Sequence, residues 1–240
     1  MKQDLISDIK GHLKDARRVV CLTGAGVSAE SGVPTFRGVG GLWNGHKATE
    51  LATPEAFERD PKLVWEFYDF RRRNLFDIKP NPAHYALAKF AGENKKEFTL
   101  ITQNVDGLHA LAGSLNVLEL HGNIWRVKCL ECGTISDNRE VPVTILPYCE
   151  CGGLLRPDIV WFGEALPEGV FASAFQVASQ AEVILVVGTS GIVEPAASLA
   201  RLTKANGGIT VEINPEATPL SSMMDLVVNE KAGEFLPTIM

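Results

Sequence analysis

Short apolar runs recur along the chain, and longer segments with a helical pattern separate them. The runs are residues 18–23, 98–102, 183–187 and 209–213, and small or polar residues follow each of them. Each run has the length and composition of a buried strand. Strands that alternate with helix-length segments indicate βαβ units and a parallel sheet. We therefore expect an α/β fold built on a doubly wound parallel sheet.

Two segments interrupt this alternation. Residues 38–78 are rich in aromatic and charged side chains and have a helical pattern, most clearly over 61–76, whereas residues 122–157 hold four cysteines and few helix signals. We expect these two insertions to form a smaller domain against the sheet. The larger domain would then comprise the rest of the chain: residues 1–37, 79–121 and 158–240. A cleft between two domains is a favoured place for a ligand.

Polar residues and glycines gather where the predicted strands end. The four segments concerned are Gly24-Ala25-Gly26, Gln103-Asn104-Val105-Asp106, Gly188-Thr189-Ser190 and Asn214-Pro215-Glu216. In parallel sheets the ligand lies at the carboxyl ends of the strands, so four such ends favour one extended ligand. The alternative is that strand ends are loops, and loops are polar whatever they do.

The first strand runs through the glycines of residues 24–26 toward residues 28–31, which have the character of a helix opening. Glycines let the backbone approach an anion, and a helix N-terminus complements its charge. Arg37 adds a bidentate grip for an anion, and Phe36 an apolar cover beside it. The dinucleotide fingerprint is matched only in part, because Glu50 is loosely placed for the ribose, so an ordinary tight turn stays open.

Charge and composition exclude some classes of function. The net charge of −6 gives no general electrostatic attraction to nucleic acid or to an anionic membrane surface. The N-terminus has no apolar core of a signal peptide, and no stretch approaches the length of a membrane span. We expect a cytoplasmic, monomeric protein whose five cysteines are reduced or bound to metal.

Four of the cysteines form two close pairs, Cys129 with Cys132 and Cys149 with Cys151, and sixteen residues separate the pairs. Thiolates at this spacing, each pair followed by glycine, predict a tetrahedral zinc site. An all-thiolate set leaves no open coordination position, so we expect a structural role. A disulfide and a catalytic cysteine are weaker alternatives. Cys21, inside an apolar strand, is expected to be a small buried hydrophobe.

His121 follows the apolar stretch 115–120 and precedes a glycine. A lone histidine in such a place is often structural. Asn104 and Asp106, at the preceding strand end, could orient a ribose, and imidazole has the pKa range to take a proton from a sugar hydroxyl. The other histidines, at 12, 46, 84 and 109, have less polar company in the sequence.

These motifs together resemble the sirtuins, which are NAD-dependent protein-lysine deacylases with a Rossmann-like domain and a structural zinc. The matching segments are residues 21–37, 102–109, 119–123, 156–164, 188–197 and 211–216. The resemblance implies that His121 is the general base and that Asn104 assists catalysis. It places the NAD phosphates at Gly24, Ala25 and Gly26, and the nicotinamide side at Phe36 and Arg37. The remaining NAD contacts that it implies are Gln103 and Asn104 at the ribose, Asp106 at the carboxamide, and Gly188, Thr189, Ser190, Asn214, Glu216, Lys231 and Ala232 on the adenosine half.

The resemblance also implies the reaction and the partner. Nicotinamide leaves the ribose, the acyl oxygen of the substrate lysine captures C1′, and His121 helps a ribose hydroxyl attack the imidate that results. The products would be nicotinamide, free lysine and an acyl-ADP-ribose ester. The acylated peptide would add as a strand along Val160, Trp161, Phe162 and Gly163. An ordinary core strand is the alternative for that segment.

Tyr68 and Arg71 stand three residues apart in the helical insertion and therefore share a helix face. A phenol beside a guanidinium can hold a carboxylate, although Arg72 and Arg73 also allow an exposed basic face. The pair is similar to that of the sirtuin subclass that removes succinyl and malonyl groups, and Ala52 matches the small residue of its widened pocket. The resemblance thus implies a desuccinylase and demalonylase with some deacetylase activity. The alternatives are a deacetylase alone, ADP-ribosyl transfer to protein, or a zinc-ribbon adaptor without turnover.

Overall fold

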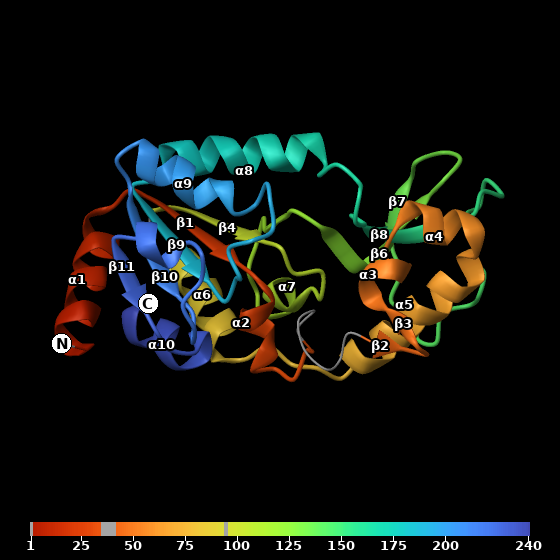
Figure 1. Cartoon of the computed structure of the whole chain (residues 1–240), viewed down its shortest axis with the longest axis horizontal. Helices are drawn as coiled ribbons and strands as arrows, with labels where there is room; N and C mark the ends of the chain where they lie inside the picture. The colour runs from red at the N-terminus through yellow and green to blue at the C-terminus, as the bar shows by residue number, and fades with distance from the viewer. Residues whose placement is uncertain (1, 35–41, 94–95) are drawn as a thin grey trace.

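The computed structural model describes residues 2–34, 42–93 and 96–240 (Figure 1). A six-stranded parallel sheet in the order β11-β10-β9-β1-β4-β5 forms its larger part. The strands are β1 (Arg18–Thr23), β4 (Glu97–Thr102), β5 (Leu118–Glu119), β9 (Val183–Val187), β10 (Ile209–Ile213) and β11 (Leu226–Val228). The chain builds outward from β1 first to one side and then to the other. The carboxyl end of β1 is therefore the topological switch point where such sheets bind ligands.

Helices cover both faces of this sheet (Figure 1). One face carries α1 (Lys2–Asp15), α6 (Pro82–Glu93) and α10 (Ala232–Ile239), and the other carries α8 (Glu168–Gln180) and α9 (Ser198–Ala205). Successive residues of a strand point to opposite faces, so Val19 and Cys21 join the first core while Val20 and Leu22 join the second. Burial on both faces explains why β1 is an unbroken apolar run.

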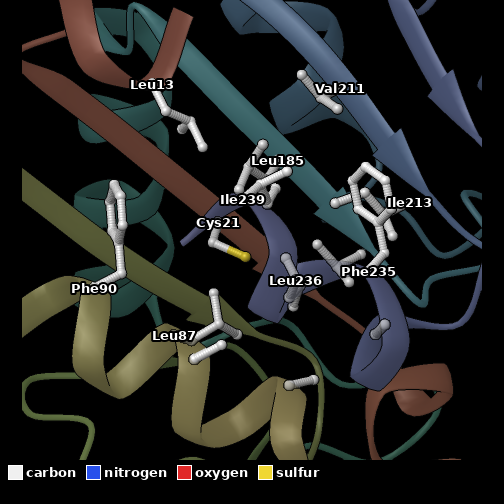
Figure 2. Packing of buried hydrophobic residues seen from close by; sticks show 14 of the residues in the cluster. Leu13, Cys21, Leu87, Phe90, Leu185, Val211, Ile213, Phe235, Leu236 and Ile239 are labelled. Carbon is white, nitrogen blue, oxygen red and sulfur yellow. The ribbon is translucent and has the colours of Figure 1, made fainter. Parts of the chain in front are cut away.

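Figure 2 shows the first of these cores around Cys21, whose sulfur points toward Leu87 of α6 and Leu236 of α10. The helix α6 buries Ala83, Leu87 and Phe90, which recur at the spacing of one helix face. Burial raises the pKa of the Cys21 thiol far above its usual range. The prediction that Cys21 is a small buried hydrophobe is confirmed.

The two insertions form the other part of the molecule, seen at the right of Figure 1. It holds a three-stranded antiparallel sheet in the order β7-β6-β8 and a two-stranded sheet of β2 and β3. Its elements are β2 (Leu42–Trp43), β3 (His46–Lys47), α3 (Ala48–Leu51), α4 (Pro54–Arg59), α5 (Pro61–Leu75), β6 (Gly122–Cys129), β7 (Ile135–Asp137) and β8 (Leu155–Ile159). One apolar core joins residues of both insertions, Trp65 and Tyr68 from the first and Ile124 and Trp125 from the second. The strand β8 ends at Ile159, two residues beyond the predicted end of the second insertion at residue 157. The residue bounds of the two domains stay a prediction.

Helix α5 begins where the sequence contains its start signals. Asp60 caps it by accepting a hydrogen bond from the Leu63 amide at 2.9 Å, and Pro61 occupies its first turn. Its buried face contains Val64, Trp65, Tyr68, Arg72 and Leu75. The predicted helix over 61–76 is therefore confirmed to within one residue.

The short helix α2 (Ala25–Ala29) differs from the prediction. It starts directly after Gly24, three residues before the expected opening at residue 28. Gly26 therefore belongs to the helix and not to the turn. The described residues also contain two further short helices, α7 (Leu108–Leu111) and the 3-10 helix η2 (Ser221–Met223). Within the described residues, no helix has both the length and the apolar character needed to cross a membrane.

Candidate active site

The carboxyl ends of β1 and β9 touch through glycines. The Gly24 amide donates to the Val187 carbonyl at 3.0 Å, and the Gly26 amide to the Gly188 carbonyl at 2.7 Å. A Cβ on Gly26 would lie 2.8 Å from Gly188 Cα, and a Cβ on Gly188 would lie 2.5 Å from the Val27 amide nitrogen. These glycines thus permit a close approach of two loops. The amides of Gly24 and Gly26 already donate to carbonyls of the chain.

A polar network lies directly behind this glycine loop. Asn104 donates through Nδ2 to the Gly24 carbonyl at 3.0 Å and to Ser28 Oγ at 3.1 Å. Ser28 donates in turn to Asp106 Oδ2 at 2.7 Å, while the Leu108 amide donates to Asp106 Oδ1 at 2.8 Å. Both Asn104 and Asp106 are buried. Burial raises the pKa of Asp106, and the hydrogen bonds from Leu108 and Ser28 oppose that rise.

Two histidines with less polar company in the sequence, His84 and His109, extend the same network in the structure. His84 accepts from the Asn81 amide at Nδ1, so its proton lies on Nε2, 3.5 Å from Ser28 Oγ. His109 Nε2 lies 2.9 Å from Thr23 Oγ1, and the two imidazole centroids are 4.8 Å apart. Burial lowers the pKa of His84 to about 4, and burial together with His84 lowers that of His109 to about 3. Both are therefore neutral near pH 7.

His121 stands between the two parts of the molecule, after β5 and before β6. Its Nδ1 lies 2.9 Å from the Gln103 carbonyl, an acceptor only, so Nδ1 carries the proton and Nε2 has a free lone pair. Burial lowers the pKa of His121, and the Gln103 carbonyl opposes this. A neutral imidazole with a basic Nε2 is the form that a general base requires.

The predicted adenosine-side residues follow β9, β10 and β11. Gln103 Nε2 donates to Thr189 Oγ1 at 2.9 Å, which links the ends of β4 and β9. The Asn214 amide donates to the Val228 carbonyl at 3.0 Å, and its side chain to the Glu216 carbonyl at 2.7 Å. The other four residues on this side differ in exposure. Ser190 is half-buried, Glu216 and Lys231 are exposed, and Ala232 is buried at the start of α10. Phe36 and Arg37 lie outside the described residues.

The four predicted zinc ligands converge. The Sγ atoms of Cys129, Cys132, Cys149 and Cys151 all lie within 4.8 Å of one another. The shortest contacts are 3.5 Å between Cys129 and Cys151 and 3.8 Å between Cys132 and Cys149. Zn–S bonds of about 2.3 Å in a tetrahedron place the sulfurs about 3.8 Å apart, so this set fits a closed zinc site. Cys129 ends β6 and Cys132 lies in the turn to β7, whereas His121 directly precedes β6 at its other end.

Tyr68 and Arg71 lie side by side, as their helix spacing predicts. The Arg71 guanidinium carbon is 5.5 Å from the centroid of the Tyr68 ring. Burial raises the pKa of Tyr68, whereas Arg71 and a hydrogen bond from Trp161 oppose this rise. Burial lowers the pKa of Arg71, and the negative charge of Asp106 is among the factors that oppose it. Arg71 is half-buried against the rings of Phe67 and Tyr68, so it is not part of an exposed basic face.

Residues 160–163 do not form a strand. The strand β8 ends at Ile159, and the chain then turns, with Gly163 at φ +89°. The Val160 amide donates to the His121 carbonyl at 3.0 Å, and the Phe162 amide to the Ala52 carbonyl at 2.9 Å. These two bonds overturn the core-strand alternative. They place this loop between the histidine and the buried Ala52.

Comparison with known proteins identifies the family. The profile of the Sir2 family matches residues 24–195. An NAD-dependent protein deacylase of Aquifex aeolicus is 53% identical over 223 residues, which cover 92% of this chain and 93% of the relative. The chain belongs to the Sir2 family. Another Sir2 relative, the NAD-dependent protein deacylase of Pyrococcus furiosus, is 50% identical over 242 residues, which cover 98% of this chain and 96% of the relative.

Solved Sir2 structures have the same fold over the whole chain. The crystal structure of a Sir2 homologue in complex with NAD gives a TM-score of 0.90 at 46% identity and covers 100% of this chain and 92% of its own. A Sir2–p53 peptide–NAD complex gives a TM-score of 0.87 at 34% identity and covers 98% of this chain and 97% of its own. The predicted family, Rossmann-like α/β fold and enzyme class are confirmed.

Four residues of the polar network behind the glycine loop were not predicted, namely Thr23, Ser28, His84 and His109. Ser28 lies within the glycine-loop motif. A polar residue in the short helix that follows the glycines is a sequence signal from which Ser28 could have been predicted. His84 has no such signal, because 55 residues separate it from Ser28 and only the packing of α6 on the sheet joins them.

Proposed function

We propose that this chain is an NAD-dependent protein-lysine deacylase that releases nicotinamide, free lysine and an acyl-ADP-ribose ester. The observation that carries the proposal is the state of His121, a half-buried neutral imidazole whose Nδ1–H donates to the Gln103 carbonyl. Its Nε2 keeps a lone pair, and Gln103, which holds the ring, directly precedes Asn104 of the Asn104–Ser28–Asp106 network. Membership of the Sir2 family supports the same activity.

Different residues would contact different parts of NAD. The loop of Gly24, Ala25 and Gly26 would hold the NAD phosphates, and the ends of β9 and β10 the adenosine half. When bound, NAD supplies the ADP-ribosyl group that takes up the acyl oxygen, with nicotinamide as the leaving group. Asn104 would orient the ribose, since its amide is fixed by the Gly24 carbonyl and Ser28. His121 takes the proton from the ribose hydroxyl at Nε2.

Zinc would have a structural role in this enzyme. Four thiolates would fill all positions of a tetrahedral zinc ion and leave none for water or substrate. The metal would join the β6–β7 turn to residues 149–153, where the Cys149 amide donates to the Gly153 carbonyl at 2.8 Å.

We propose that the acyl pocket accepts succinyl and malonyl groups and retains some activity on acetyl. Tyr68 and Arg71 would bind the distal carboxylate, the arginine through charge and the phenol through its hydroxyl. The buried Ala52 offers only a methyl group beside them, which leaves room for the longer acyl chain. The acylated lysine would belong to a protein segment that docks along residues 160–163, and a Sir2 relative forms a complex with a p53 peptide.

A charge-neutral replacement of Arg71 tests this pocket. Arg71→Met is expected to lower the ratio of succinyl-lysine to acetyl-lysine turnover by tenfold or more, because a charge-assisted hydrogen-bond pair is lost. Arg73→Met is the matched control, since Arg73 pairs with Asp69 at 2.7 Å on the outer side of α5. An unchanged ratio in Arg71→Met would refute the preference and leave a deacetylase.

Two other functions make different predictions for the same assay. ADP-ribosyl transfer would place label from NAD on protein without releasing free lysine, and an adaptor would show no turnover. The neutral His121 next to an acyl pocket favours deacylation over both. The cytoplasm as location and a monomer as active form stay predictions.

A further inference from the structure

The indole of Trp161 donates a hydrogen bond to the hydroxyl of Tyr68. Trp161 Nε1 and Tyr68 Oη are 2.9 Å apart, and both side chains are buried, at 3% and 0% exposure. An indole N–H can only donate, so the phenol oxygen must accept from it. The phenol's own hydrogen is therefore directed to another acceptor. This sets the direction of one polar group in the acyl pocket.

We infer that Trp161 is a positioning residue for acyl specificity, which fixes the Tyr68 hydroxyl as a donor to the distal carboxylate of a dicarboxylic acyl group. The inference rests on the proposed succinyl and malonyl pocket and deepens it. A phenol that faces a carboxylate must present its hydrogen, because two acceptors would repel each other. Burial keeps Tyr68 protonated near neutral pH, in agreement with this role.

The Trp161 ring is held firmly enough to act in this way. The guanidinium carbon of Arg156 lies 3.5 Å from the ring centroid, and the Phe57 ring lies 5.2 Å from it. Arg156 is itself fixed by two hydrogen bonds to Glu164, at 2.6 and 2.9 Å. The Trp161 amide also donates to Glu164 at 2.8 Å. The indole is thus clamped between a paired guanidinium and an aromatic ring.

The backbone on either side of Trp161 connects it to the rest of the pocket. The preceding residue, Val160, donates to the His121 carbonyl, and the following residue, Phe162, donates to the Ala52 carbonyl. One three-residue segment therefore links the general base, the small pocket residue and the phenol. A substrate that docks on this segment meets a Tyr68 hydroxyl already directed for its carboxylate.

Trp161→Phe removes the indole donor and keeps an aromatic ring in the clamp. We expect the succinyl-to-acetyl ratio of kcat/KM to fall about fivefold, mainly through a higher KM for the succinyl peptide, since one oriented hydrogen bond is lost. Trp65→Phe is the matched control. Trp65 is also buried, and Trp65→Phe also removes an indole hydrogen bond of 2.9 Å, but the acceptor of that bond is the Leu155 carbonyl. The succinyl-to-acetyl ratio of kcat/KM in Trp65→Phe is expected to stay at the wild-type value.

A double-mutant cycle with Tyr68→Phe completes the test. Without the phenol oxygen, Trp161→Phe is expected to change the ratio no further. Equal ratio changes in the two tryptophan variants, or a full effect of Trp161→Phe in the Tyr68→Phe background, would overturn the inference and leave the proposed pocket standing. A wild-type enzyme that does not prefer succinyl-lysine would instead overturn the proposed pocket and the inference with it.

Discussion

The protonation of His121 determines whether the site can act as a base. Its Nδ1–H is committed to the Gln103 carbonyl, and burial disfavours the imidazolium that would block Nε2. The same burial that holds the ring in place thus gives it the charge state that catalysis needs.

The pH profile is expected to show this lowered pKa. Because the base form exists above the pKa, kcat/KM for an acyl-lysine peptide should fall as the pH drops, with a midpoint under the ordinary value of about 6.5. Initial rates of nicotinamide release across pH 5 to 8 measure it. A midpoint above 7 would contradict a desolvated base.

Single residues also show how far the sequence could lead. Asn104, Asp106, Tyr68 and the zinc cysteines were predicted because each lies within a local motif. His84 and His109 could not be, since their partners Ser28 and Thr23 come from other parts of the chain. The Trp161–Tyr68 bond likewise joins residues that are 93 positions apart.

At the scale of elements, the glycine loop depends on the contact between the ends of β1 and β9. Gly188 has φ +58° and no space for a Cβ, whereas Gly207 has φ +83° with nothing within 4 Å of one. The two positions share a backbone conformation unfavourable to other residues and differ in the close approach.

Gly188→Ala is therefore expected to weaken NAD binding at least tenfold, while Gly207→Ala shows only the cost of strain, about 1 kcal/mol in stability. Calorimetric titration with NAD and thermal unfolding separate the two effects. Equal NAD affinities in both variants would show that the close approach does not shape the cofactor site.

The zinc module makes its own prediction. Removal of one thiolate, as in Cys132→Ser, is expected to reduce the zinc content below one ion per chain. It is also expected to lower the unfolding temperature, because the β6–β7 turn loses its crosslink. Cys21→Ala should keep one ion, since Cys21 lies in the other core. Metal analysis of the purified proteins decides it. Full zinc content in Cys132→Ser would contradict the assignment.

Elements were predictable where burial is complete and less so elsewhere. The bounds of β1, β9 and β10 match the apolar runs, because strands buried on both faces are mostly apolar along their whole length. The edge strands β5 and β11 have two and three residues and were not predicted. A core strand was only the alternative for residues 160–163, and it is wrong, because the Val160 amide bonds to His121 and the Phe162 amide to Ala52.

For the whole molecule, the buried histidine pair makes stability depend on pH. The pKa of His84 is about 4 in the folded chain and about 6.5 when unfolded, so the unfolded state binds more protons between these values. The contribution of His84 to the free energy of unfolding is therefore fully present above pH 6.5 and is lost as the pH drops toward 4.

His84 alone is expected to cost about 2 kcal/mol of unfolding free energy between pH 7.5 and 5. His84→Asn keeps an acceptor for the Asn81 amide and has no titrating group, so its loss over the same range should be smaller by about that amount. Denaturant unfolding at the two pH values measures the difference. Identical losses in both proteins would show that His84 is protonated without cost.

The central claim is that this fold couples NAD cleavage to removal of an acyl group from lysine, with His121 as the base. Product accounting with NAD and a succinyl-lysine peptide tests it most directly. The account predicts nicotinamide, free-lysine peptide and succinyl-ADP-ribose in equal amounts, and the loss of all deacylated peptide in His121→Ala. Nicotinamide release without free lysine, or deacylation that persists in His121→Ala, would contradict it.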